Sequence, residues 1–212
     1  MRSASQATTG DSLTLFDTLV LGSRAGATSR PGLGQQVAAV GLVTALTVVA
    51  AQISVPLPFT PVPFTFQPMV VLVGAAALGS QLGAWSQVLY LALGLAGLPV
   101  FAASPTLPQG AARLLGPTGG YLMAYPFAAF VAGWLAERGF DRRYVMAVVA
   151  MACGLSVVFA GGVGWLSFIS RPALGFAGAM RIGFTPFIAA DVLKLLVAAG
   201  IMPSLWFLHR RL

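Results

Sequence analysis

The longest uncharged stretch of this chain does most to decide its fold. From residue 31 to residue 112 the sequence contains no aspartate, glutamate, lysine, arginine or histidine. A soluble domain carries about 25% charged residues, whereas this chain of 212 residues carries 8% and is 58% hydrophobic. Because no water-exposed surface can be built from such a stretch, the sequence predicts an all-α integral membrane protein.

Six apolar segments resemble membrane-crossing helices, which need roughly 20 residues to cross about 30 Å of hydrocarbon. They are Gln35–Val55, Met69–Leu82, Trp85–Leu98, Tyr121–Glu137, Tyr144–Trp165 and Pro186–Leu208. The second and third are short and separated at GSQLGAW, which indicates a tight helical hairpin. We therefore expect a six-transmembrane-helix bundle over residues 35–212, preceded by a polar tail over residues 1–34. A short interfacial helix is expected around Leu13–Leu21.

The arginines indicate how the bundle lies in the membrane. Six helices place both termini on one side, which would then carry Arg2, Arg24, Arg30, Arg138, Arg142, Arg143, Arg210 and Arg211. The opposite side would carry only Arg113, Arg171 and Arg181. Basic loops stay in the cytoplasm, so both termini are expected there. Positive charge at helix ends also explains the net charge of +7 without a nucleic-acid partner.

The long connections all fall on the outer side, at Pro56–Pro68, Pro99–Gly120 and Leu166–Thr185. The first contains VPLPFTPVPFTFQP. Proline fixes φ and lacks a donor N–H, so this segment is expected to be neither helix nor sheet ladder but a stiff, extended connector. Its phenylalanines would fold inward as a lid; the alternative is a rigid turn between two helices.

The second connection ends in LLGPTGGYLMAYP at the start of a helix. Glycines allow a ligand to approach the backbone closely, and the unpaired N–H groups of a helix N-terminus suit a carboxylate or another anionic group. The same glycines also fit a simple helix-entry turn, so the pattern alone leaves both interpretations open.

One oppositely charged pair interrupts the last apolar segment, in FIAADVLKLLVAAG. Asp191 and Lys194 are three residues apart, so they share a helix face and can touch. A charge at membrane depth costs several kcal/mol, which makes such residues face the bundle interior. The pair is either a neutralised structural couple or the wall of a polar pocket near the outer face.

The sequence contains no catalytic or metal-binding set. His209 is the only histidine and Cys153 the only cysteine, so neither a metal cluster nor a disulfide is expected. The chain also lacks a GxxxxGK[ST] loop, so active transport would need a separate ATPase. Gly41 and Ala45 form a small-residue face that another helix could approach closely, or that could pack within the bundle.

Four separated segments resemble one family. VPLPFTPVPFTFQ, LGLAGLPVFA, LLGPTGGYL and PFIAADVLKL occur in this order, and together they resemble BioY, the biotin-binding S component of energy-coupling-factor (ECF) transporters. The resemblance covers about Val37 to Ile201. It implies a six-helix bundle in the prokaryotic cell (inner) membrane that captures biotin at the outer side. An EcfT-type membrane subunit and ATP-binding subunits would then drive uptake.

The resemblance also implies roles for single residues. The expected substrate-binding residues are Asp191, Lys194, Tyr90, Thr118, Gly119, Gly120, Tyr121 and Arg113. The expected lid residues are Phe59, Phe64 and Gln67, and the face for EcfT lies around Gly41 and Ala45. After LPVFA this chain reads ASPTLPQGAAR, where many members of the family continue with a glycine-rich stretch. Arg113 falls in this departure, on the side where it could meet a carboxylate.

The chemistry of biotin suits the charged pair. Its ureido ring has two N–H donors, which Asp191 could accept, and one carbonyl, to which Lys194 could donate. The carboxylate would then lie near the GPTGGY turn or Arg113, although the reverse orientation stays open. No cofactor is expected beyond biotin as the substrate. Three alternatives remain: an S component for another vitamin, an intramembrane lipid-modifying enzyme, and a structural partner subunit. A homo-oligomer is also possible.

Overall fold

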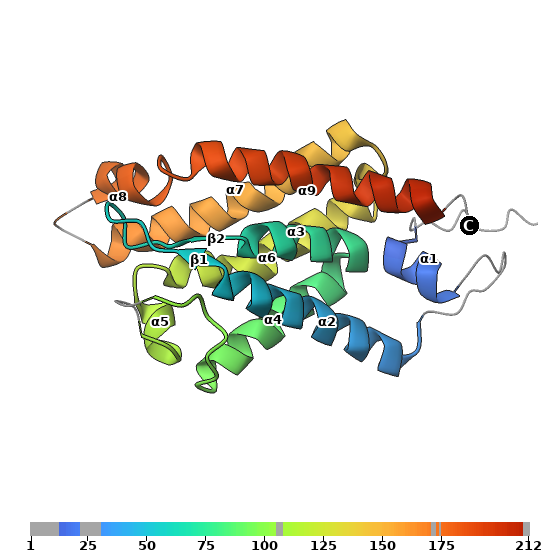
Figure 1. The fold of residues 1–212 in the computed structure, drawn as a ribbon, viewed down its shortest axis with the longest axis horizontal. Helices are drawn as coiled ribbons and strands as arrows, with labels where there is room; N and C mark the ends of the chain where they lie inside the picture. The colour runs from blue at the N-terminus through green and yellow to red at the C-terminus, as the bar shows by residue number, and fades with distance from the viewer. Residues whose placement is uncertain (1–12, 22–30, 105–107, 171–172, 174, 210–212) are drawn as a thin grey trace, which may run out of the picture.

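The computed structural model describes residues 13–21, 31–104, 108–170, 173 and 175–209. Residues 1–12 and 22–30 of the expected N-terminal tail lie outside these ranges. So do the arginines at positions 2, 24, 30, 171, 210 and 211. Within the described residues the chain is a bundle of helices with one pair of short strands (Figure 1).

A helix covers each of the six apolar segments. These helices are α2 (Leu33–Gln52), α3 (Gln67–Leu78), α4 (Ser80–Leu95), α6 (Gly119–Ala136), α7 (Tyr144–Ile169) and α9 (Ile188–His209). By length and composition, α2, α6, α7 and α9 are able to cross a membrane. Helix α3 has 12 residues and α4 has 16, or about 18 and 24 Å at 1.5 Å per residue. The helical membrane class is thus confirmed, while six crossings and cytoplasmic termini stay predictions.

Shorter elements occupy the ends of the bundle. They are α1 (Leu15–Leu21), β1 (Ser54–Val55), β2 (Phe64–Thr65), α5 (Ala111–Leu115), the 3-10 turn η1 (Phe140–Arg142) and α8 (Gly175–Gly183). Figure 1 shows β1, β2, α5 and α8 at one end, which we call the strand end. Helix α1 and the last turn of α9 lie at the other end, which we call the terminal end.

The expectation that the proline-rich loop forms no ladder was wrong at its borders. Strand β1 pairs with β2 in antiparallel fashion, with Ser54 opposite Thr65 and Val55 opposite Phe64. The prolines at 56, 58, 61 and 63 lie between the strands, so the paired residues keep the N–H groups that a ladder needs. Pro68 lies in the first turn of α3, where a missing N–H costs nothing.

The turn between α3 and α4 is tighter than the sequence suggested. Helix α3 ends at Leu78 and α4 begins at Ser80, because Gly79 alone reverses the chain at φ 87°. The carboxylate of Glu137 accepts hydrogen bonds from the backbone N–H of Ser80 at 2.6 Å and from its hydroxyl at 2.9 Å. The first of these bonds pairs a backbone N–H at the N-terminus of α4 that has no partner within the helix. Together the two bonds fix the α3–α4 hairpin against the end of α6.

Helix α6 lies at the centre of the bundle and packs against α3, α4 and α7. Towards the terminal end its buried face consists of small residues, namely Ala128, Ala129, Ala132, Gly133 and Ala136. Neighbouring helices approach so closely that a methyl group on Gly154 of α7 would meet Leu72 at 2.4 Å. Towards the strand end the same helix carries Tyr121 and Tyr125. Larger side chains there separate the helices and leave room between them.

Candidate functional site

A cavity lies between the helices at the strand end. Its walls come from α6, α7, α9, the start of α3, the proline-rich segment before it and the connection from α4 to α6. Most lining side chains are apolar or aromatic, and three are charged: Arg113, Asp191 and Lys194. The site is therefore an apolar chamber with a few polar groups at set positions.

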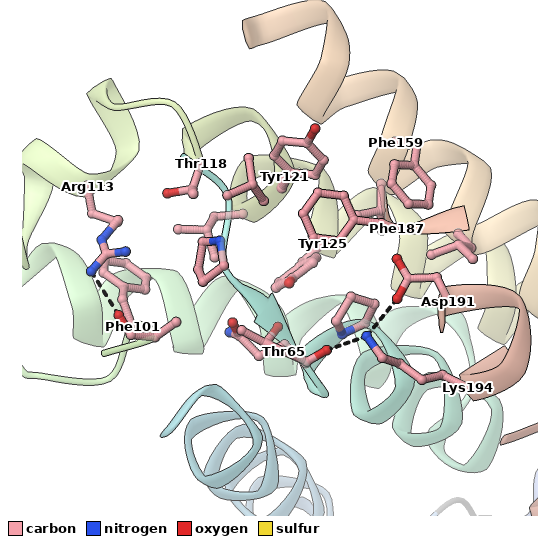
Figure 2. A pocket seen from close by; sticks show the side chains of 18 residues that line it. Thr65, Phe101, Arg113, Thr118, Tyr121, Tyr125, Phe159, Phe187, Asp191 and Lys194 are labelled. Atoms are coloured by element: carbon pink, nitrogen blue, oxygen red, sulfur yellow. Dashed lines mark hydrogen bonds and ion pairs between the residues drawn. The ribbon is translucent and has the colours of Figure 1, made fainter. Parts of the chain in front are cut away.

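The charged pair of α9 lies at one side of this cavity (Figure 2). The ammonium of Lys194 donates to Oδ1 of Asp191 at 2.6 Å, and each side chain is 9% exposed. Among the described residues, none donates a hydrogen bond to the other carboxylate oxygen, Oδ2. Asp191 therefore keeps an acceptor for a ligand, while the ion pair offsets the cost of burying two charges.

Lys194 also binds the segment that was expected to form a lid. Its ammonium donates to the backbone carbonyl of Thr65 in β2 at 2.7 Å and lies 3.5 Å from the ring centre of Phe64. A lysine ammonium has three donors, so one remains after Asp191 and Thr65. This single side chain thus connects the charged pair, the lid strand and the cavity.

Arg113 lies on the other side of the cavity in Figure 2, beyond Tyr121 and Tyr125. It is 1% exposed and donates to the backbone carbonyls of Pro108 at 2.7 Å and Ala102 at 2.8 Å. Burial lowers the pKa of its guanidinium from the usual value. A buried guanidinium at a cavity wall is suited to an anionic group, because a carboxylate there would offset the lost hydration.

Thr118 lines the cavity at the N-terminus of α6. Its hydroxyl is buried and has no hydrogen-bond partner among the described residues. A buried hydroxyl without a partner costs free energy, so a polar ligand atom beside it would be stabilising. Tyr121 lines the cavity as well, and its hydroxyl donates to the carbonyl of Gly183 at 2.7 Å.

The two glycines after Thr118 have a packing role in the structure. A methyl group on Gly119 would meet the carbonyl oxygen of Leu114 at 1.8 Å, and one on Gly120 would meet Cβ of Trp165 at 2.2 Å. Neither glycine is among the lining residues of the cavity. Their absent side chains allow α5 and α7 to approach the start of α6, which places Thr118 and Tyr121 at the cavity.

The chain is similar to known proteins of one family. A model described as "BioY family" matches residues 16–211. The chain belongs to the BioY family. The biotin transporter BioY of Thermotoga maritima is 41% identical over 78% of this chain and 92% of the relative. A probable biotin transporter BioY of Pyrococcus horikoshii is 40% identical over 81% and 96%.

A solved structure shares the fold of this BioY-family chain. It is the crystal structure of the S-component for biotin from an ECF-type ABC transporter. The two superpose with a TM-score of 0.70 and 28% sequence identity, over 82% of this chain and 93% of the other. The family is one of transporter S components, and no enzyme is indicated.

Tyr90 takes a different place from the other residues that the BioY resemblance suggested. It is fully buried and is not among the residues that line the cavity. Its ring packs edge-on against Phe101, with centroids 5.5 Å apart. Its hydroxyl accepts a hydrogen bond from Nε2 of Gln67 at 2.6 Å. Tyr90 therefore reaches the cavity only through Gln67, which does line it.

The lid residues expected from the BioY family separate into two groups. Phe64 contacts Lys194 and Gln67 lines the cavity, whereas Phe59 is 60% exposed at the outer surface of the proline-rich loop. On α2, Gly41 has no atom within 4 Å of the position where a Cβ would stand. Ala45 is exposed, so the face of α2 around Gly41 and Ala45 does not pack against another part of the described chain.

Several wall residues were not predicted from the sequence. They are Thr65, Phe101, Tyr125, Leu155, Val158, Phe159 and Phe187. Thr65 and Phe101 lie in two of the long connections, and the other five lie in apolar segments, where composition gives no signal that separates a cavity residue from a lipid-facing neighbour. In the part of the chain that the structure describes, no group of histidine, cysteine, aspartate and glutamate could hold a metal ion.

Proposed function

We propose that this chain is the biotin-binding subunit of an uptake transporter. The observation that carries the proposal is the buried Asp191–Lys194 pair at the wall of an aromatic cavity under a short lid. Membership of the BioY family and likeness to the S-component for biotin support the same conclusion. The alternative of a neutralised strut is less favoured, because a strut needs no cavity beside it.

The proposed orientation places the ureido ring at the charged pair. Oδ2 of Asp191 accepts from a ring N–H, and the remaining donor of Lys194 meets the ring carbonyl. The aromatic side chains between the two polar sides contact the bicyclic ring and the valeryl chain. The carboxylate then lies near the buried guanidinium of Arg113 and near the hydroxyl of Thr118, which has no hydrogen-bond partner among the described residues.

Energy coupling is proposed to come from other subunits. The sequence has no phosphate-binding loop for ATP. An EcfT-type membrane subunit and ATP-binding subunits would therefore couple ATP hydrolysis to uptake. The unpacked face of α2 around Gly41 and Ala45 is the proposed contact for EcfT, since small residues let helices approach closely. Residues 35–212 would form the membrane domain, with six crossings and cytoplasmic termini in a prokaryotic cell membrane.

Calorimetry on the full chain in lipid nanodiscs tests the substrate. We expect biotin to bind, and desthiobiotin to compete because it keeps the ureido ring and the carboxylate. Riboflavin and thiamine serve as unrelated vitamins and should not compete. Absence of biotin binding, or displacement of biotin by either unrelated vitamin, would overturn the proposal in favour of an S component for another substrate.

A further inference from the structure

Gln67 and Tyr90 form a hydrogen-bonded chain that ends at a backbone carbonyl. Nε2 of Gln67 donates to the hydroxyl of Tyr90 at 2.6 Å, and that hydroxyl donates to the carbonyl of Val100 at 3.2 Å. Gln67 is 2% exposed and Tyr90 is fully buried. The chain lies behind the cavity wall, between the start of α3, the middle of α4 and the connection after α4.

The direction of these hydrogen bonds follows from the last acceptor. A backbone carbonyl has no proton to give, so the hydroxyl of Tyr90 must donate to Val100. The hydroxyl oxygen is then available only as an acceptor for Gln67, which must present its NH₂ group rather than its carbonyl oxygen. The two ends of a glutamine amide are otherwise nearly interchangeable. The carbonyl of Val100 thus sets the orientation of the Gln67 amide through the hydroxyl of Tyr90.

This orientation leaves the amide oxygen Oε1 for the cavity. Gln67 lines the cavity, and among the described residues none donates a hydrogen bond to Oε1. Oε1 is also absent from the fully enclosed polar atoms without partners, which agrees with its being reached from the cavity. A buried acceptor without a donor is unfavourable, so a ligand N–H group there would be stabilising.

We infer that Tyr90 is a positioning residue, which fixes the amide of Gln67 so that the cavity accepts an N–H donor from the ligand. This inference rests on the proposed function. The polar groups that then face the ligand are two acceptors, Oε1 of Gln67 and Oδ2 of Asp191, and one donor, the third N–H of Lys194. A cyclic urea offers the complement of two N–H groups and one carbonyl. Each N–H of the ureido ring would thus have its own acceptor.

The inference is tested with biotin and its two mono-N-methyl ureido derivatives, on wild-type protein and Tyr90→Phe. Tyr90→Phe keeps the ring against Phe101 and removes only the hydroxyl, so the amide of Gln67 is free to turn. We expect the variant to bind biotin roughly tenfold more weakly, the usual effect of one hydrogen bond. For the derivative whose methyl group replaces the N–H at Gln67, the affinities of wild type and variant should agree within about twofold.

A second variant and a control separate positioning from folding. Gln67→Met removes the amide and keeps a side chain of similar size. This variant should no longer prefer biotin over the derivative whose methyl group replaces the N–H at Gln67. Tyr90→Phe added to Gln67→Met should then have little further effect, since both act on one contact. Tyr144→Phe is the matched control: it removes a hydroxyl that donates to the carbonyl of Leu196 at 3.2 Å on the exposed surface, and should leave binding unchanged.

The outcomes distinguish this inference from the proposed function. If wild-type protein does not bind biotin, the proposed function fails. If wild type binds biotin but Tyr90→Phe weakens biotin and both derivatives equally, or weakens none, Tyr90 does not orient Gln67 and the inference is overturned. Should Tyr90→Phe not fold, Gln67→Met decides alone, because equal losses for all three ligands would exclude an acceptor at Oε1.

Discussion

The two ends of the bundle each bury one carboxylate, with different results. At the strand end, Asp191 is 7% exposed, pairs with Lys194 and borders a cavity. At the terminal end, Asp141 in η1 is 3% exposed, accepts from the indole N–H of Trp206 and is surrounded by alanine and methionine. Its Oδ1 has no partner among the described residues. The two buried carboxylates therefore differ in their surroundings: Asp191 lines the cavity beside a basic partner, whereas Asp141 is enclosed by small and apolar side chains.

The basic residues beside these two carboxylates also differ in what they contact. Lys194 divides its donors among the acid, the lid strand and the cavity, whereas Arg142 lies over the ring of Trp206, 4.9 Å from its centre. The terminal end thus joins the α6–α7 turn to the last turns of α9. We expect changes at the strand end to alter binding, and changes at the terminal end to alter stability.

The largest effect is expected for Asp191→Asn. It removes the charge that Lys194 needs and replaces an acceptor oxygen by a donor. The ligand loses a hydrogen bond to a charged group, worth about 1.5–3 kcal/mol, and Lys194 loses the partner that positions it, so biotin affinity should fall by roughly 100-fold or more, as measured by calorimetry in nanodiscs. Asp141→Asn is the control at the other end and should keep its affinity. Affinity within twofold of wild type for Asp191→Asn would contradict the role of the pair.

Arg113→Gln is expected to have the next largest effect. A charge-assisted hydrogen bond contributes about 1.5–3 kcal/mol, so biotin should bind roughly 10- to 100-fold more weakly. Biotin methyl ester lacks the anionic group, and its affinity should be similar for wild type and variant. An equal loss for acid and ester would show that Arg113 acts through its contacts within the chain, such as those with the carbonyls of Pro108 and Ala102, or that biotin lies in the reverse orientation.

Trp206→Phe should affect stability and leave binding unchanged. The change removes the donor to Asp141 and leaves that buried carboxyl without its partner. Loss of one buried hydrogen bond costs about 1–3 kcal/mol, which should appear as a lower midpoint in a thermal melt in detergent. Biotin affinity should stay within about twofold. A clear loss of affinity at an unchanged midpoint would remove the distinction between the two ends.

The smallest effect concerns pH. Burial raises the pKa of the Asp141 carboxyl above its ordinary value, and the hydrogen bond from Trp206 only partly offsets this. The folded state then holds this proton more tightly than the unfolded state. This contribution to stability is present below the ordinary pKa and is lost as pH rises through the raised one. Melting midpoints measured over this window should fall with pH less steeply in Asp141→Asn than in wild type.

The sequence predicted those features that depend on neighbours along the chain. The six helices follow from apolar runs, and the contact between Asp191 and Lys194 follows from their spacing on one helix. Arg113 was expected near a carboxylate because it lies on the outer side of the predicted bundle, whereas its hydrogen bonds to the carbonyls of Pro108 and Ala102 follow from no sequence pattern.

Features set by contacts between distant segments were not predictable in this way. Tyr90 lies behind the cavity because of a contact with Gln67, which is 23 residues away. Tyr125 lines the cavity because of the face that α6 presents when it packs between α3, α4 and α7. The pairing of β1 with β2 depends on the return path of the proline-rich loop. Each of these depends on the orientation of one element against another, which local periodicity does not contain.

The bond from Lys194 to the carbonyl of Thr65 links the position of a strand to a charge at the cavity. Any displacement of β2 would take one hydrogen-bond acceptor away from this buried ammonium. The backbone at this end of the bundle and the electrostatics of the cavity are therefore coupled through one side chain.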